Sequence, residues 1–180
     1  MIGITYFSVD GHTKKICGRL LEIFKSKGIV AELIPITELD LDVSKYQTLV
    51  IGASIRYGKH SKEIIQFIQK NKSQLKSIST AFFSVNLVAR KPDKNRPDTN
   101  PYLIKFLKES SWEPDFKEVF AGKLDYSVYP FWDKIMIKLI MKMTDGPTST
   151  DSPIDYTDWE RVDSFGNMLV EYYSSSTHNQ

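Results

Sequence analysis

The chain has 180 residues, 41% of them hydrophobic, and a formal net charge of +2 at pH 7. This length can bury one substantial core, and no shift in composition divides it, so we expect one domain over 1–173 and a polar C-terminal tail at 174–180. The small net charge and the lack of a recognition motif argue against a nucleic-acid partner. No secretory signal pattern precedes the first apolar run, and a single cysteine suits a reducing compartment, so we expect a cytoplasmic protein.

Apolar runs alternate with segments of helical periodicity along the chain. Short buried strands are expected at five places: Ile2–Phe7, Val30–Ile34, Thr48–Ala53, Thr80–Val85 and Lys117–Ala121. Amphipathic helices are expected between and after them: around 16–24, at Ser61–Leu75, around Pro101–Leu107 and at Asp158–Tyr172. This alternation predicts βαβ units with right-handed crossovers, and therefore a three-layer α/β sandwich around a parallel sheet.

The strand order 2-1-3-4-5 is the arrangement that five such strands favour. In a sheet of this kind the ligand lies beyond the carboxyl ends of the strands, near the switch point between strands 1 and 3. The turns after strands 1, 3 and 4 are therefore the predicted functional segments.

The turn after strand 1 has the features of a phosphate cradle. It opens a helix, whose first N–H groups and dipole attract an anion. Hydroxyl groups in this turn can donate to a phosphate, and a glycine lets the backbone approach it closely. The candidate residues are Ser8, Val9, Asp10, Gly11, His12 and Thr13. A dinucleotide glycine fingerprint and a P-loop lysine are both missing, which favours a mononucleotide. An ordinary capped βα turn is the alternative interpretation.

The pattern Ser8-x-Asp10-Gly11-x-Thr13 resembles the phosphate loop of flavodoxins, which usually carry Thr where Asp10 stands. The resemblance implies a flavodoxin-like fold and one FMN. A carboxylate beside a phosphate is repulsive, so we expect Asp10 to cap the helix instead.

The same resemblance implies roles for the two later turns. Residues flanking the flavin are expected after strand 3, at Ser54, Ile55, Arg56, Tyr57 and Gly58, with Tyr57 stacking on the ring unless it is only a surface aromatic. After strand 4, the flavin's polar edge is expected to meet Ser84, Val85, Asn86, Leu87, Val88 and Ala89. Arg90 and Lys91 follow, either as ligands of an anionic substrate or as solvated charges.

Four segments together resemble a narrower family, the flavodoxin-like, quinone-linked protoporphyrinogen oxidases of bacterial haem synthesis. These segments are 50–58, 83–92, 131–146 and 156–160, and the similarity spans roughly 2–170. The resemblance implies FMN-dependent, six-electron oxidation of protoporphyrinogen IX to protoporphyrin IX, with menaquinone or ubiquinone as acceptor at the inner membrane. Hydride can pass directly from a porphyrinogen carbon to the flavin, so we assign no catalytic residue, and we expect no metal.

A helical insertion is expected at about 123–155, because the connection between strand 5 and the last helix is unusually long. Within it, the segment 131–143 is predicted to be a helix that carries a basic stripe on an otherwise apolar surface. The candidates for contact with an anionic membrane are Trp132, Lys134, Lys138 and Lys142. The apolar run is too short to span a bilayer, and a core helix is the alternative.

Two other functions remain open on the sequence alone. An electron-carrying flavodoxin would have no substrate chemistry of its own, although such carriers tend to be acidic and lack a basic apolar insertion. A flavin-free α/β signalling domain would show no yellow chromophore. The preferred quinone and the oligomeric state are left open.

Overall fold

A parallel sheet forms the centre of the computed structural model, which describes residues 1–36, 41–127, 131–143, 146–149 and 152–178. Its strands are β1 (Ile2–Phe7), β2 (Ala31–Pro35), β3 (Thr48–Arg56), β5 (Ser79–Val85) and β6 (Phe116–Phe120). They lie in the order β2-β1-β3-β5-β6, and each neighbouring pair is parallel. The predicted order 2-1-3-4-5 is confirmed, since the extra strand β4 (Lys59–His60) only adds an antiparallel pair to the end of β3.

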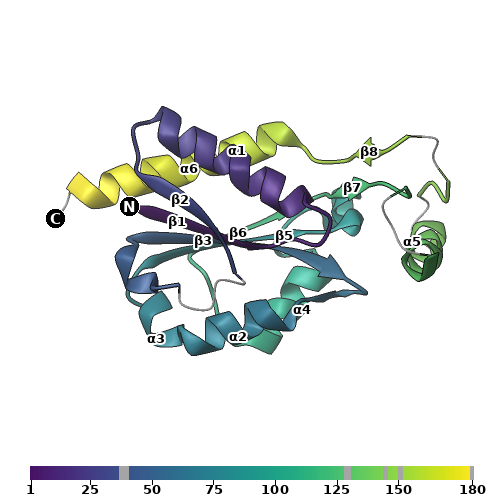
Figure 1. The fold of residues 1–180 in the computed structure, drawn as a ribbon, viewed down its shortest axis with the longest axis horizontal. Coiled ribbons are helices and arrows are strands. Elements are labelled where there is room, and N and C mark those ends of the chain that lie inside the picture. Colours follow the sequence, from purple (N-terminus) through teal and green to yellow (C-terminus); the bar gives the residue numbers. More distant parts are fainter. Residues whose placement is uncertain (37–40, 128–130, 144–145, 150–151, 179–180) are drawn as a thin grey trace.

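Helices cover both faces of the sheet (Figure 1). On one face lie α1 (His12–Ser26) and α6 (Trp159–His178); on the other lie α2 (Lys62–Lys70), α3 (Lys72–Leu75) and α4 (Pro101–Ser110). Short 3-10 turns occur at η1 (Val43–Lys45), η2 (Leu87–Arg90) and η3 (Pro92–Lys94). Each layer buries its own apolar cluster, as expected for a sheet that is apolar on both sides.

Two helices differ from their predicted bounds. The helix expected at 61–75 is divided at Asn71, whose side-chain amide donates to the carbonyl of Phe67. The tail expected from 174 is wrong in its boundary, because α6 continues to His178. The hydroxyls of Ser175 and Ser176 donate to the carbonyl of Tyr172, which lets polar residues extend the helix. Residues 179 and 180 lie outside the described part of the chain.

The insertion begins and ends on a small antiparallel ladder. Strands β7 (Lys123–Leu124) and β8 (Ile154–Asp155) form this ladder and pair Lys123 with Asp155. Between them, α5 (Phe131–Met143) forms where a helix was predicted and lies beyond the carboxyl ends of the sheet strands (Figure 1). Positions 128–130, 144–145 and 150–151 of the insertion are outside the described residues. No helix in the described ranges is long and apolar enough to cross a membrane.

Candidate functional site

A pocket opens at the carboxyl ends of β1, β3 and β5, where the switch point of the sheet was predicted to hold a ligand. All three predicted turns contribute to it, and the insertion closes one side. Its lining consists of Ser8, Val9, Asp10, His12, Thr13, Ser54, Ile55, Arg56, Tyr57, Gly58, Val85, Asn86, Leu87, Val88, Tyr102, Gly122, Lys123, Asp125, Met136 and Ile137.

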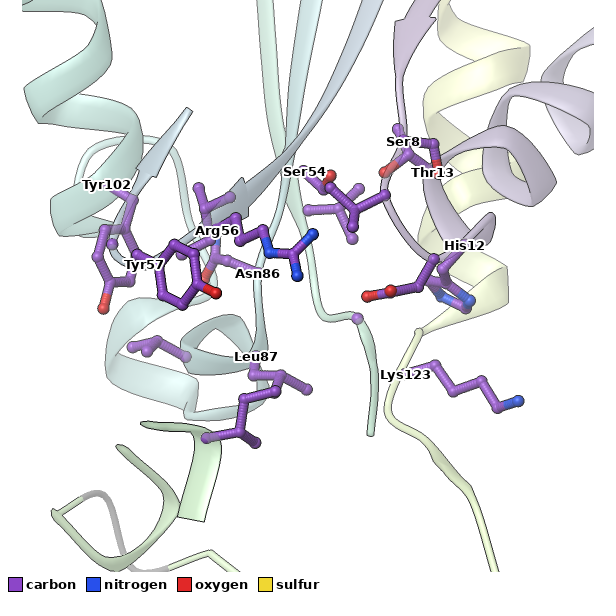
Figure 2. Close-up of a pocket in the computed structure, with 18 of the residues that line it drawn as sticks. Ser8, His12, Thr13, Ser54, Arg56, Tyr57, Asn86, Leu87, Tyr102 and Lys123 are labelled. Atoms are coloured by element: carbon purple, nitrogen blue, oxygen red, sulfur yellow. The ribbon is translucent and has the colours of Figure 1, made fainter. Parts of the chain in front are cut away.

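Three buried hydroxyls at this pocket lack hydrogen-bond partners among the described residues. They are the Oγ of Ser8, the Oγ1 of Thr13 and the Oγ of Ser54. Figure 2 shows Ser8 and Thr13 beside each other, with Ser54 on the neighbouring strand end. A buried hydroxyl without a partner costs free energy, so donors gathered at the start of α1 indicate a site for an anion.

Asp10 does not occupy the N-cap position of α1. Helix α1 begins at His12, and its N-cap is Gly11, with φ of 78° and no side-chain cap. Asp10 lies one residue earlier, exposed, on the pocket wall. A Cβ added at Gly11 would meet nothing within 4 Å, so its left-handed backbone, rather than crowding by the protein, is what requires glycine there.

The second turn is a two-residue hairpin that joins β3 to β4. Arg56 pairs with Lys59, and the two residues between them, Tyr57 and Gly58, both have positive φ, 50° and 73°. Such a turn matches the twist of the strands and holds a bulky residue in a conformation that it rarely adopts. Tyr57 is 58% exposed and lies next to Tyr102 at the pocket (Figure 2). Strand β3 therefore extends past its predicted end at Ala53 and carries Arg56 into the pocket lining.

The third turn is fixed by a buried amide pair. The Asn86 oxygen accepts from the amide of Ala89 and from Asn100, while its nitrogen donates to Ser84 and to Asn100. The side-chain amide of Asn86 is thus bonded to the protein while the residue lines the pocket, and its contact with the flavin edge stays a prediction. The turn lines the pocket with Val85, Asn86, Leu87 and Val88.

His60 belongs to the same buried network. Its Nε2 lies 2.9 Å from the Ser84 Oγ, and its ring packs against Phe106 at 4.6 Å. Burial lowers the pKa of His60 to about 3. His60 is therefore neutral near pH 7 and serves the packing of the turn rather than proton transfer.

Some predicted site residues lie away from the pocket. Gly11, Ser84 and Ala89 are not in its lining. Arg90 donates from Nη1 to the carbonyl of Leu87 and lines a separate crevice, and Lys91 lines neither hollow. This predicted substrate pair is not part of the pocket lining, and the Arg90 guanidinium lies over the ring of Tyr156 instead.

Other pocket residues were missing from the sequence prediction. They are Tyr102 at the start of α4, Met136 and Ile137 on α5, and the β7 region at Gly122, Lys123 and Asp125. For the residues of the insertion, the sequence signal was its excess length, which does not say which of its side chains face the domain; for Tyr102, on α4, there was no such signal.

Comparison with known proteins gives the class first. The family model described as a flavodoxin domain matches residues 3–151. The crystal structure of oxidised flavodoxin 1 from Bacillus cereus is similar with a TM-score of 0.52, at 14% identity, over 94% of this chain and 97% of that one, which supports the fold. Fold and pocket together define a flavodoxin-domain protein.

Curated relatives are similar over nearly the whole chain. Protoporphyrinogen IX dehydrogenase (quinone) of Escherichia coli K12 is 42% identical over 175 residues, 97% of each chain. The protein of the same name from Leishmania major is 41% identical over 164 residues, 90% of this chain and 71% of its own. The chain belongs to the family of quinone-linked protoporphyrinogen IX dehydrogenases.

The residues present fit FMN. Its single phosphate matches the hydroxyls without partners at the start of α1, those of Ser8 and Thr13, and that of Ser54 on the neighbouring strand β3. Its planar ring matches a pocket walled by Tyr57, Tyr102 and Leu87.

Proposed function

We propose that this chain binds FMN in the pocket and oxidises protoporphyrinogen IX to protoporphyrin IX with a respiratory quinone as acceptor. The observation that carries the proposal is the set of hydroxyls of Ser8, Thr13 and Ser54, buried without partners at the switch point of a flavodoxin fold. Family membership supports the substrate and the acceptor. Bound FMN supplies two-electron chemistry, so a six-electron oxidation takes three rounds.

The protein's own residues position the substrate. Protoporphyrinogen IX is a large apolar ring with two propionates, and the pocket offers both apolar walls and cations. Figure 2 shows the Arg56 guanidinium directed into the middle of the pocket, whereas the Lys123 side chain points away from the middle and its ammonium donates to Asp125 at 3.0 Å. Arg56 therefore replaces Arg90 and Lys91 as our proposed partner of a propionate.

Anaerobic spectroscopy of the FMN-loaded protein tests the function. Protoporphyrinogen IX should bleach the flavin absorbance, and a menaquinone analogue should restore it while porphyrin fluorescence appears. Dithionite serves as the control reductant. A flavin that dithionite reduces and quinone reoxidises, but that protoporphyrinogen IX leaves oxidised, would identify an electron carrier instead.

We also propose that α5 docks peripherally on an anionic membrane from the cytoplasmic side. The helix turns Met141 inward against Leu124, and its outward surface bears Trp132 at 73% and Leu139 at 51% exposure. Lys138 and Lys142 are exposed and Lys134 is half-buried, on a stripe beside these apolar side chains. An exposed apolar surface next to cations suits lipid better than the core-helix alternative.

Changing Lys134, Lys138 and Lys142 together to Glu should lower sedimentation of the protein with anionic vesicles and reduce turnover with membrane quinone. Each lysine contributes on the order of 1 kcal/mol at such a surface, so three give weak, salt-sensitive attraction. FMN content and turnover with a water-soluble quinone should be unchanged. Equal vesicle binding by the variant and the native protein would return α5 to the role of a pocket cover.

A further inference from the structure

His12 joins the anion-binding turn to the insertion. Its Nε2 lies 2.6 Å from the Oγ1 of Thr157, just after β8. The Thr157 hydroxyl donates its one hydrogen to the carbonyl of Ala121 at 2.8 Å. Nε2 of His12 must therefore carry a hydrogen and donate it to Thr157, which fixes the direction of the bond.

Charged and aromatic contacts surround this hydrogen bond. Asp155 accepts from the amide of Thr157 at 3.0 Å and lies 3.6 Å from both His12 Nε2 and the ammonium of Lys15. The Lys15 ammonium also lies 4.6 Å from the ring centre of Trp159. The first turn of α1 is thus attached to the chain segment that closes the insertion. His12 is half-buried there, and burial lowers its pKa while Asp155 opposes that effect.

The insertion attached in this way is also a pocket wall. Asp155 pairs with Lys123 across the β7–β8 ladder, and Lys123 lines the pocket together with Met136 and Ile137 of α5. In the chain, His12 directly precedes Thr13, whose hydroxyl has no hydrogen-bond partner among the described residues. The His12 side chain therefore joins the phosphate turn to the chain segment that carries this wall.

We propose that His12 is a positioning residue that couples FMN binding in the turn to the placement of the insertion over the pocket, an inference that rests on the proposed FMN site. Coupling of two sites is reciprocal, so an occupied turn should protect the insertion from opening, and loss of the His12–Thr157 bond should weaken FMN binding. Both effects act through the same hydrogen bond.

The test compares apoprotein variants by FMN fluorescence quenching and by hydrogen exchange of residues 123–127 and 152–157. His12→Leu and Thr157→Val should each raise the FMN Kd about tenfold, within the usual range of coupling, and the double variant no further. FMN should slow exchange in these segments of the native protein and much less in the variants. His12→Gln, which keeps an N–H donor, should restore most of both effects.

Asp163→Asn is the matched control. Asp163 accepts two hydrogen bonds from Arg19, at 2.7 and 2.8 Å, and so joins α6 to α1 at a place away from the turn. This change should lower thermal stability but leave the FMN Kd and the exchange difference unchanged. If His12→Leu does not fold, Thr157→Val tests the same bond from the other side.

Three outcomes would overturn the coupling. They are a native FMN Kd in both single variants, additive losses in the double variant, or an exchange difference that survives in Thr157→Val. If the native apoprotein takes up no FMN, the proposed function is overturned as well. If the native protein binds FMN and the variants bind it equally well, only the coupling is overturned.

Discussion

Thr13→Val is expected to stabilise the apoprotein and, at the same time, to weaken FMN binding by about one to two orders of magnitude. The side chain of Thr13 is 1% exposed, and its Oγ1 has no partner among the described residues. Replacing an unsatisfied buried hydroxyl by a methyl group of similar shape removes a desolvation cost. A hydrogen bond from that hydroxyl to a phosphate is worth about 1.5–3 kcal/mol, which gives the expected loss of affinity.

Urea unfolding of the apoprotein and FMN titration measure the two effects separately. Thr5→Val is the matched control, because the Oγ1 of Thr5 is also buried without a partner in the described structure but is not part of the pocket lining. It should raise the unfolding midpoint and leave the FMN Kd unchanged. If Thr13→Val lost stability and kept its affinity, the anion would have to bind elsewhere.

Arg56→Gln is expected to lower kcat/KM for protoporphyrinogen IX by roughly 10- to 100-fold, chiefly through KM. This range corresponds to the loss of about 1.5–3 kcal/mol from a charge-assisted hydrogen bond to a propionate. With the dimethyl ester of the same porphyrinogen the carboxylate is gone, so native protein and variant should differ little. The comparison of two substrates separates a contact with the propionate from any general damage to the site.

Arg90→Gln removes the same charge outside the pocket. Its guanidinium donates to the carbonyl of Leu87, so any loss should be equal for the acid and the ester. FMN content is measured for every variant. An equal penalty with both substrates in Arg56→Gln would assign Arg56 to the cofactor or to the fold, and an acid-specific penalty in Arg90→Gln would restore the pair first predicted.

Sequence patterns predict the sheet well because runs of apolar residues correspond directly to buried strands. The run Thr48–Ala53 is buried on both faces as predicted, and the turns after β1, β3 and β5 converge because parallel strands end at one edge. What could not be predicted is the direction of polar side chains. Asn86 turns to Asn100, and Arg90 turns to a carbonyl, although either residue could equally have faced a ligand.

The insertion shows a second limit of such patterns. The periodicity of 131–143 predicts a helix and a basic stripe, and α5 has the expected bounds. Periodicity does not say which apolar side packs back on the domain, so the pocket contacts of Met136 and Ile137 were missing. The hairpin at Tyr57 was missed for a different reason, since a tyrosine with positive φ runs against local preference.

The placement of sulfur atoms determines where oxidative damage falls. Cys17, the one cysteine of the chain, is a fully buried residue of α1, and burial raises the pKa of its thiol. Peroxide attacks thiolates, so this thiol is protected from oxidants released near a flavin. The accessible thioethers on α5 are Met136 and Met143, at 40% and 76% exposure. Oxidation of Met143, which is outside the pocket lining, to a sulfoxide would make the proposed lipid-facing surface more polar and loosen its attachment, and methionine sulfoxide reductases can reverse that change.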